Sequence, residues 1–128
     1  MFDYVKFASD VHASDTYGKL PYAVHLQDVA DRVSDDLKPL AWCHDLIEDH
    51  PEVLPDLRRL VPTEFLFQVL LITRRDSESY FEYIRRIKDF GNTPARRVKI
   101  ADIHANLARV PSPSLTKRYQ DALHILEM

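Results

Sequence analysis

Apolar residues recur mostly three and four positions apart along this 128-residue chain, which is the spacing of one face of an α-helix. In the segment 78–89, Tyr80, Ile84 and Ile87 form such a stripe, and charged residues occupy the opposite face. Packing against a core is the ordinary explanation of this stripe. No run of residues shows a convincing strand pattern, so the sequence predicts an all-α fold.

Proline and glycine mark where these helices begin and end. The eight prolines lie between the apolar-periodic stretches, and Gly18 and Gly91 are the two glycines of the sequence. At Thr93-Pro94, a hydroxyl side chain suited to capping precedes a proline suited to the first helical position. We predict helices near residues 2–15, 24–35, 37–50, 53–60, 63–74, 78–89, 94–109 and 114–127.

Length and composition indicate one globular domain over residues 1–128, because the chain is long enough for one core and too short for two ordinary domains. Hydrophobic residues make up 45% and charged residues 29%, which is typical of a soluble protein. No apolar run approaches the length of a membrane span. The first six residues lack a basic leader and a long apolar core. We therefore expect a cytoplasmic protein with no membrane partner.

The formal net charge of −3 argues against a nucleic-acid partner, since such binding needs a dense basic surface. Basic pairs such as Arg74-Arg75 are most simply solvated helix faces, although some are placed to face a small phosphorylated ligand. The single cysteine, Cys43, excludes an internal disulfide and agrees with a reducing compartment. Its position on an apolar helix favours packing over a nucleophilic role.

The densest chemistry of the sequence is the run 44–49, HDLIED, which places an imidazole and three carboxylates in an apolar helical segment. Burying such groups without a partner is costly, so the run predicts a bound cation. His25 upstream and Asp102 downstream complete a set with His44 and Asp45. Two imidazoles and two carboxylates suit Mn²⁺, Fe²⁺, Co²⁺, Ni²⁺ or Zn²⁺. Four protein ligands leave positions for water and a phosphate oxygen on an ion that prefers six.

Two further carboxylates follow these ligands by one helical turn. Glu48 lies four residues after His44, and Asp49 lies four residues after Asp45, so each projects from the same side as the earlier ligand. The alternative is a solvated C-terminal turn of a helix, where acids oppose the helix dipole. The other histidines, His12, His50, His104 and His124, are left unassigned, since a lone histidine on an apolar face is usually part of the core.

The ordered set of a lone His, then His-Asp, then a distant Asp resembles the HD-domain metal-dependent phosphohydrolases. Four segments are similar to the hydrolase domain of the RelA/SpoT family and to its stand-alone small alarmone hydrolases: PYAVH at 21–25, AWCHDLIED at 41–49, ITR at 72–74 and VKIAD at 98–102 with Asn106. The resemblance spans roughly residues 10–126, and it implies a single HD-domain helical bundle.

That resemblance also implies the roles of individual residues. One divalent ion, Mn²⁺ by preference, would be held by His25, His44, Asp45 and Asp102. Glu48 and Asp49 would orient and deprotonate the attacking water. The residues expected to contact a nucleotide substrate are Tyr17, Arg74, Lys99, Asn106 and Tyr119.

The function implied is hydrolysis of the 3′-pyrophosphate of guanosine polyphosphates, the alarmones of the stringent response. The alternatives are an HD-type nucleotidase or deoxynucleotide triphosphohydrolase, and a non-catalytic nucleotide-sensing HD module. One departure concerns the base: Thr16 and Tyr17 stand where the family usually has an Arg-Lys pair. We therefore expect looser base recognition, with an exposed Tyr17 stacking on the nucleobase.

Overall fold

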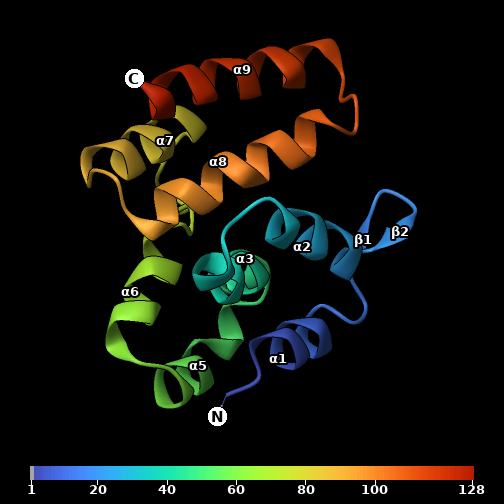
Figure 1. Ribbon diagram of the computed structural model, residues 1–128, viewed down its shortest axis with the longest axis vertical. Coiled ribbons are helices and arrows are strands. Elements are labelled where there is room, and N and C mark those ends of the chain that lie inside the picture. Colours follow the sequence, from blue (N-terminus) through green and yellow to red (C-terminus); the bar gives the residue numbers. More distant parts are fainter. Residues whose placement is uncertain (1) are drawn as a thin grey trace.

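The computed structural model describes residues 2–128 and is built almost entirely of helices (Figure 1), so the all-α prediction is confirmed. No helix in this range is long and apolar enough to cross a membrane. Short 3₁₀ turns at Asp35–Leu37 and Pro51–Val53 precede α3 and α5. The α-helices are α1 (Tyr4–Val11), α2 (Tyr22–Asp31), α3 (Lys38–Cys43), α4 (Leu46–Asp49), α5 (Leu54–Leu60), α6 (Thr63–Leu71), α7 (Tyr80–Asp89), α8 (Pro94–Leu107) and α9 (Pro113–Glu127).

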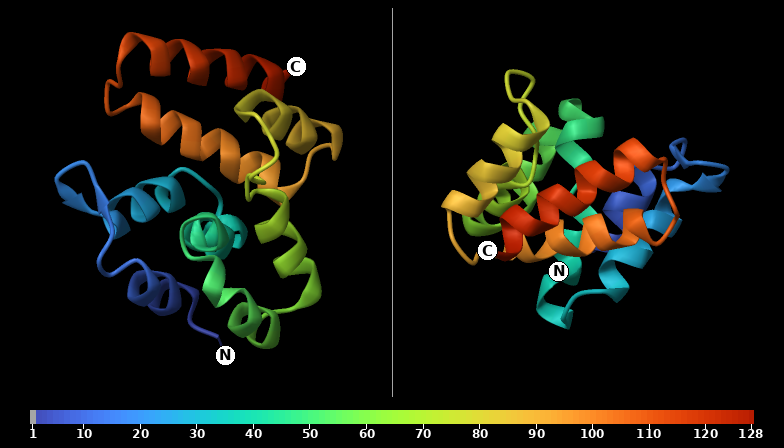
Figure 2. Two further views of the ribbon diagram at one scale, coloured as in Figure 1. Left: turned by 180° about the vertical axis from the view of Figure 1, so that it is seen from behind. Right: turned by 90° about the horizontal axis from the view of Figure 1, so that it is seen from above.

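The central helix is α3, seen end-on in the middle of Figure 1 with α1, α2, α6 and α8 around it. Its residues Leu40, Ala41, Trp42 and Cys43 are all buried, which agrees with a packing role for the cysteine. A second, smaller apolar cluster joins α7, α8 and α9 at one end of the molecule (Figure 2). Because α8 contributes to both clusters, it fixes the position of the C-terminal helices relative to the rest.

Two local predictions, one about the start of α8 and one about the buried face of α7, are supported by the observed structure. The Thr93 side chain accepts a hydrogen bond from the Arg96 backbone N–H, and Pro94 is the first residue of α8. The apolar stripe of α7 is also a core face, since Tyr83, Ile84 and Ile87 are buried. Several helix boundaries move by up to four residues; α1, for example, was predicted to reach residue 15 and ends at Val11.

The predicted continuous helix over 37–50 is wrong. His44 and Asp45 separate α3 from α4: His44 keeps helical backbone angles, with φ −65° and ψ −24°, and the departure is at Asp45, which has φ −105° and ψ 2°. Backbone hydrogen bonding resumes when the Asp49 N–H donates to the Asp45 carbonyl at 3.0 Å. An unbroken helix would point adjacent side chains about 100° apart, whereas the break brings both toward the same buried point.

A small hairpin between α1 and α2 was also not predicted. Strands β1 (Thr16–Tyr17) and β2 (Leu20–Pro21) pair antiparallel, with Gly18 at φ 61° in the connecting turn. Glycine adopts this left-handed conformation without the steric cost of a side chain. Strands of two residues are too short to show an alternating pattern, so periodicity could not predict them. The hairpin positions Tyr17 beside α2.

Candidate metal centre

Three buried side chains from separate parts of the chain meet at one point. His25 comes from α2, His44 from the break between α3 and α4, and Asp102 from α8. Asp102 Oδ1 lies 2.8 Å from His25 Nε2 and 3.2 Å from His44 Nε2. One ligand atom from each residue lies within 4.8 Å of those of the other two. Helices distant in sequence therefore converge on a shared carboxylate oxygen.

Asp45 joins this cluster from the same break in the helix. Its Oδ2 lies 3.0 Å from His44 Nε2 and accepts a hydrogen bond from the Tyr22 hydroxyl. The structure thus brings three of the four predicted metal ligands into one group, and Asp45 joins that group through its contact with His44. The four residues, His25, His44, Asp45 and Asp102, are called the α8 cluster below.

The geometry of the α8 cluster fits a divalent ion. With metal–ligand distances of about 2.1 Å, ligands at right angles are about 3 Å apart, which is the separation found for the pairs His25–Asp102, His44–Asp102 and His44–Asp45. His44 Nδ1 lies 2.6 Å from the Ala41 carbonyl oxygen, so a hydrogen bond there fixes the ring and turns Nε2 toward the cluster. His25 Nδ1 is buried and has no hydrogen-bond partner among the described residues. Imidazole and carboxylate ligands suit several divalent transition metals and single out none.

Strong electrostatic coupling accompanies this packing. Burial alone would raise the pKa of Asp102, but Lys99, His44 and His25 outweigh it and hold the pKa well below its usual range. The Lys99 ammonium donates to Asp102 Oδ2 at 2.9 Å. Burial likewise opposes the charged form of His44, yet the Asp45 and Asp102 carboxylates raise its pKa well above the usual value. A metal ion would compete with this proton for His44 Nε2.

A cavity of about 250 Å³ opens beside the α8 cluster, and His25, Asp45 and Asp102 form part of its wall. All five residues expected to contact substrate also line it: Tyr17, Arg74, Lys99, Asn106 and Tyr119. Residues predicted at scattered positions between 17 and 119 therefore line the same cavity as three of the candidate metal ligands.

The hypothesis of an exposed Tyr17 that stacks on a base does not agree with the structure. Tyr17 is half-buried, and its ring stacks on His25 with centroids 4.4 Å apart. Its hydroxyl donates to Asn106 Oδ1, and the Arg109 guanidinium lies 5.3 Å from the ring centroid. The short hairpin presses Tyr17 against α2, so the ring already contacts protein on the face toward His25.

The cationic side chains of the cavity differ in how much charge they leave for a ligand. Lys99 is largely buried and paired with Asp102, and its ammonium also lies 5.2 Å from the Tyr83 ring centroid. Arg74 is exposed, and its Nε–H donates to the Glu78 carbonyl at 3.1 Å. Arg74 therefore retains guanidinium N–H donors that can face a phosphate, whereas Lys99 is mostly neutralised.

Glu48 and Asp49 are placed differently. Glu48 lines the cavity, and its Oε1 accepts a hydrogen bond from the Arg74 backbone N–H at 2.9 Å. Partial burial raises the pKa of Glu48, and that hydrogen bond opposes the shift. Asp49 is not among the lining residues. Partial burial and the nearby carboxylates of Asp45 and Glu48 raise the pKa of Asp49 to about 6.

Sequence reasoning missed four residues of the cavity wall: Tyr22, Tyr80, Tyr83 and Arg118. The Arg118 guanidinium lies 3.8 Å from the Tyr80 ring centroid, and the Tyr80 hydroxyl is buried without a partner among the described residues. Tyr80 was assigned to the apolar stripe of α7, which concealed its hydroxyl, and the Tyr83 hydroxyl donates to the Ile72 carbonyl. The only indication of Arg118 in the sequence was that it precedes Tyr119, a predicted substrate contact.

No protein-family model and no curated protein sequence matches this chain. The HD-domain resemblance therefore stays a prediction that rests on the residues named above.

Proposed function

We propose that this protein is a metal-dependent phosphohydrolase that acts on a nucleotide, with one divalent ion, preferably Mn²⁺, held by the α8 cluster. The observation that carries the proposal is the cavity in which this cluster meets the cationic side chains of Arg74 and Arg118. A metal ion and arginines on one cavity wall suit the negative charge of a phosphate ester. An ordinary salt-bridge network in a core would not need to open onto such a cavity.

When bound, the ion would supply Lewis-acid polarisation of a phosphoryl oxygen and would lower the pKa of a water molecule. Glu48 is the proposed proton acceptor, because it lines the cavity and the Arg74 backbone N–H fixes one of its oxygens. Its second oxygen can accept the proton of the attacking water. Asp49 would support this role, because its carboxylate is close enough to interact electrostatically with that of Glu48, and a nearby negative charge favours proton uptake.

Recognition of the nucleotide would fall to residues of α7, α8 and α9 and to Arg74, which lies between α6 and α7. Arg118 and Arg74 would contact phosphate oxygens, and the unpartnered Tyr80 hydroxyl is available as a further donor. The Asn106 oxygen is taken by Tyr17, so its amide N–H groups remain for a ribose hydroxyl. Tyr119 supplies an aromatic face for a base or sugar.

We propose a guanosine 3′,5′-polyphosphate, cleaved at its 3′-pyrophosphate in the cytoplasm, as the substrate most similar to that of the resembled family. One observation favours a second candidate, a nucleotidase acting on a smaller nucleotide. The cavity of about 250 Å³ is below the range of about 300–1,000 Å³ common for drug-sized ligands. A nucleotide with one or two phosphates would be enclosed more completely than a tetraphosphate.

Hydrolysis assays with a nucleotide panel and identified products test the proposal. Metal-free protein is supplied with Mn²⁺, and the panel includes 3′,5′-polyphosphates, nucleoside triphosphates and monophosphates. We expect pyrophosphate from a 3′ position; orthophosphate would select the nucleotidase, and tripolyphosphate a triphosphohydrolase. His124→Ala, an exposed histidine outside the cavity, is the matched control. Nucleotide binding with no turnover of any substrate would contradict the enzymatic proposal.

A further inference from the structure

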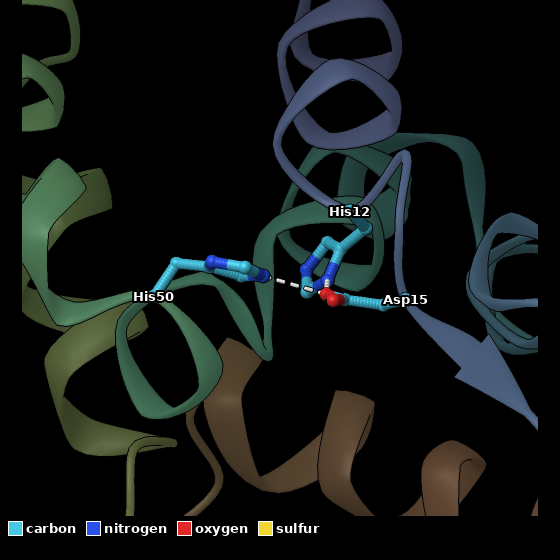
Figure 3. A group of neighbouring side chains, drawn as sticks. All are labelled: His12, Asp15 and His50. Carbon is cyan, nitrogen blue, oxygen red and sulfur yellow. Dashed lines mark hydrogen bonds and ion pairs between the residues drawn. The ribbon is translucent and has the colours of Figure 1, made fainter.

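A second group of imidazole and carboxylate side chains lies outside the α8 cluster, and it consists of His12, Asp15 and His50. His12 ends α1, Asp15 precedes β1, and His50 ends α4. Figure 3 shows the three side chains pointing toward one another from these segments. One ligand atom from each lies within 4.8 Å of those of the other two. We call this group the α1 cluster.

Two imidazole nitrogens of the α1 cluster approach the same carboxylate oxygen. Asp15 Oδ2 lies 2.7 Å from His12 Nδ1 and 2.6 Å from His50 Nε2 (Figure 3). His12 Nε2 is buried and has no hydrogen-bond partner among the described residues. The hydrogen bonds to Asp15 therefore do not occupy all of the nitrogen and oxygen atoms with which these three residues could bind a metal ion.

Neighbouring groups hold both rings in place. The His12 side chain is fully buried, and its ring stacks on Tyr22 with centroids 4.8 Å apart and 24° between the planes. His50 Nδ1 lies 3.3 Å from Glu52 Oε1, on the side of the ring away from Asp15. A histidine that binds a metal through one nitrogen commonly donates its other N–H to a carboxylate. His50 has this arrangement.

We propose that His12, Asp15 and His50 form a second divalent-metal site that takes Zn²⁺ or a similar transition metal. Two imidazoles and one carboxylate suit Zn²⁺, Co²⁺, Ni²⁺ or Cu²⁺ better than Mg²⁺ or Ca²⁺, which prefer oxygen ligands. Three protein ligands leave at least one position for water, and the Asp15 and His50 side chains are 29% and 25% exposed, so solvent reaches the site.

This site is separate from the α8 cluster. The Tyr22 ring stacks on His12, while the Tyr22 hydroxyl donates to Asp45 of the α8 cluster. An aromatic side chain thus stands between the two groups, and the observed contacts include no carboxylate shared by them. The two sites are predicted to fill independently.

An ion in the α1 cluster would link the end of α1 to the end of α4, the short helix that carries Glu48 and Asp49. The described contacts between these ends include the hydrogen bond between His50 and Asp15. A coordination centre would replace that single contact with bonds to three residues. The α1 cluster is therefore expected to stabilise the chain around the proposed proton acceptor rather than to contact substrate.

Metal titration of the whole protein tests this proposal without any activity assay. Metal-free protein is titrated with Zn²⁺ against a chromophoric chelator, and Co²⁺ absorption reports the ligand geometry. His50→Ala and Asp15→Asn are preferred to His12→Ala because both side chains are partly exposed and less important for packing. Each should bind one ion fewer than wild type. Since losing an outer partner of a metal-binding histidine costs about 10–100-fold in affinity, losing a direct ligand should cost about a hundredfold or more.

Controls separate this site from the α8 cluster and from chance binding. His124→Ala removes an exposed histidine outside both clusters and should bind as wild type does. His44→Ala should lose the α8 ion and keep the α1 ion. Glu52→Gln should weaken only the α1 ion, by about tenfold, because Glu52 orients His50. Circular dichroism confirms that each variant folds.

The proposal is overturned if His50→Ala and Asp15→Asn bind as many ions, with the same affinity, as wild type. It is also overturned if wild type binds a single ion that His44→Ala loses, in which case the proposed hydrolase survives. A single ion lost in His50→Ala and kept in His44→Ala supports the α1 site and contradicts the metal centre of the proposed hydrolase.

Discussion

The α8 and α1 clusters contain the same kinds of ligand, yet their surroundings differ. The α8 cluster is almost fully buried, and Lys99 and the rings of His25 and His44 balance its carboxylates. Arg74, Arg118 and several tyrosines line the cavity beside it. The α1 cluster is partly exposed, and none of its three residues lines that cavity. A ligand set alone therefore does not indicate catalysis, and the proposed hydrolase rests on the position of the α8 cluster beside the cavity.

The largest expected effect comes from removing a ligand of the α8 cluster. His44→Ala or Asp45→Ala should eliminate the bound Mn²⁺ and lower kcat/KM by at least about a thousandfold, equivalent to about 4 kcal/mol of transition-state stabilisation. Metal analysis and kinetics of the purified variants measure both. Unchanged Mn²⁺ content in both variants would show that the site is wrongly assigned.

Changing the proposed proton acceptor separates chemistry from metal binding. Glu48→Gln keeps the shape of the side chain but cannot accept a proton, so kcat should fall by about 10²–10⁴-fold while Mn²⁺ content is retained. Asp49→Asn should also retain the ion and lose activity, but less, because Asp49 does not line the cavity. A wild-type rate in Glu48→Gln would exclude the role assigned to this residue.

Thr16 lies between Asp15 of the α1 cluster and Tyr17 of the cavity wall, but it is itself neither a member of the α1 cluster nor a lining residue of the cavity. Thr16→Arg adds a cation at an exposed position, and a charged contact to a phosphate or base should raise kcat/KM for guanosine over adenosine 3′,5′-polyphosphates by about tenfold. Tyr17→Phe, which removes only the hydroxyl bonded to Asn106, is measured beside it to separate the effect of this hydroxyl from that of the added cation. A strongly guanosine-selective wild type would show that another part of the wall reads the base.

The smallest expected effect is on stability, away from both clusters. The Arg86 guanidinium, which is largely buried and bonded to both oxygens of Glu78, lowers the pKa of that carboxyl to about 2. A depressed folded-state pKa stabilises the fold above the unfolded value of about 4.5, and this contribution is lost as pH falls from about 4.5 toward 2.

Glu78→Gln should therefore lower the free energy of unfolding by about 1–2 kcal/mol at pH 7, after allowance for screening of a pair near the surface. The difference from wild type should shrink below pH 4. Urea denaturation at pH 7 and pH 3 gives both values. A constant difference across this range would mean that the charge pair does not account for the shift.

The sequence predicted the helices well because their apolar periodicity and proline positions are local signals. It did not predict the break at His44 and Asp45, because the apolar pattern continues through these residues. The contact that accompanies the break, between His44 and Asp102, joins residues far apart in the chain. The run 44–49 drew attention to His44 and Asp45, because three neighbouring carboxylates are unusual in an apolar segment, whereas His25 and Asp102 were proposed because they complete the ordered set of the resembled family. Tyr80 and Tyr83 were missed because an apolar stripe says nothing about where a hydroxyl at its edge points.

The α1 cluster was not predicted either, because one of its members is distant in sequence from the other two. His12 and Asp15 are three residues apart, but His50 is distant in sequence, and a single histidine near a single aspartate carries no local sign of metal binding. Only the folded chain brings His50 beside Asp15. The contact between the segment after α1 and the end of α4 therefore decides whether these three residues form one group.

The most direct test of the central claim is a titration of metal-free protein with Mn²⁺, in which bound ion and nucleotide hydrolysis are measured on the same samples. The account predicts that turnover rises in proportion to occupancy of a site that His44→Ala lacks, and that the His50→Ala variant keeps this behaviour. Turnover that is the same before and after Mn²⁺ is added, or Mn²⁺ bound equally by wild type and His44→Ala, would contradict it.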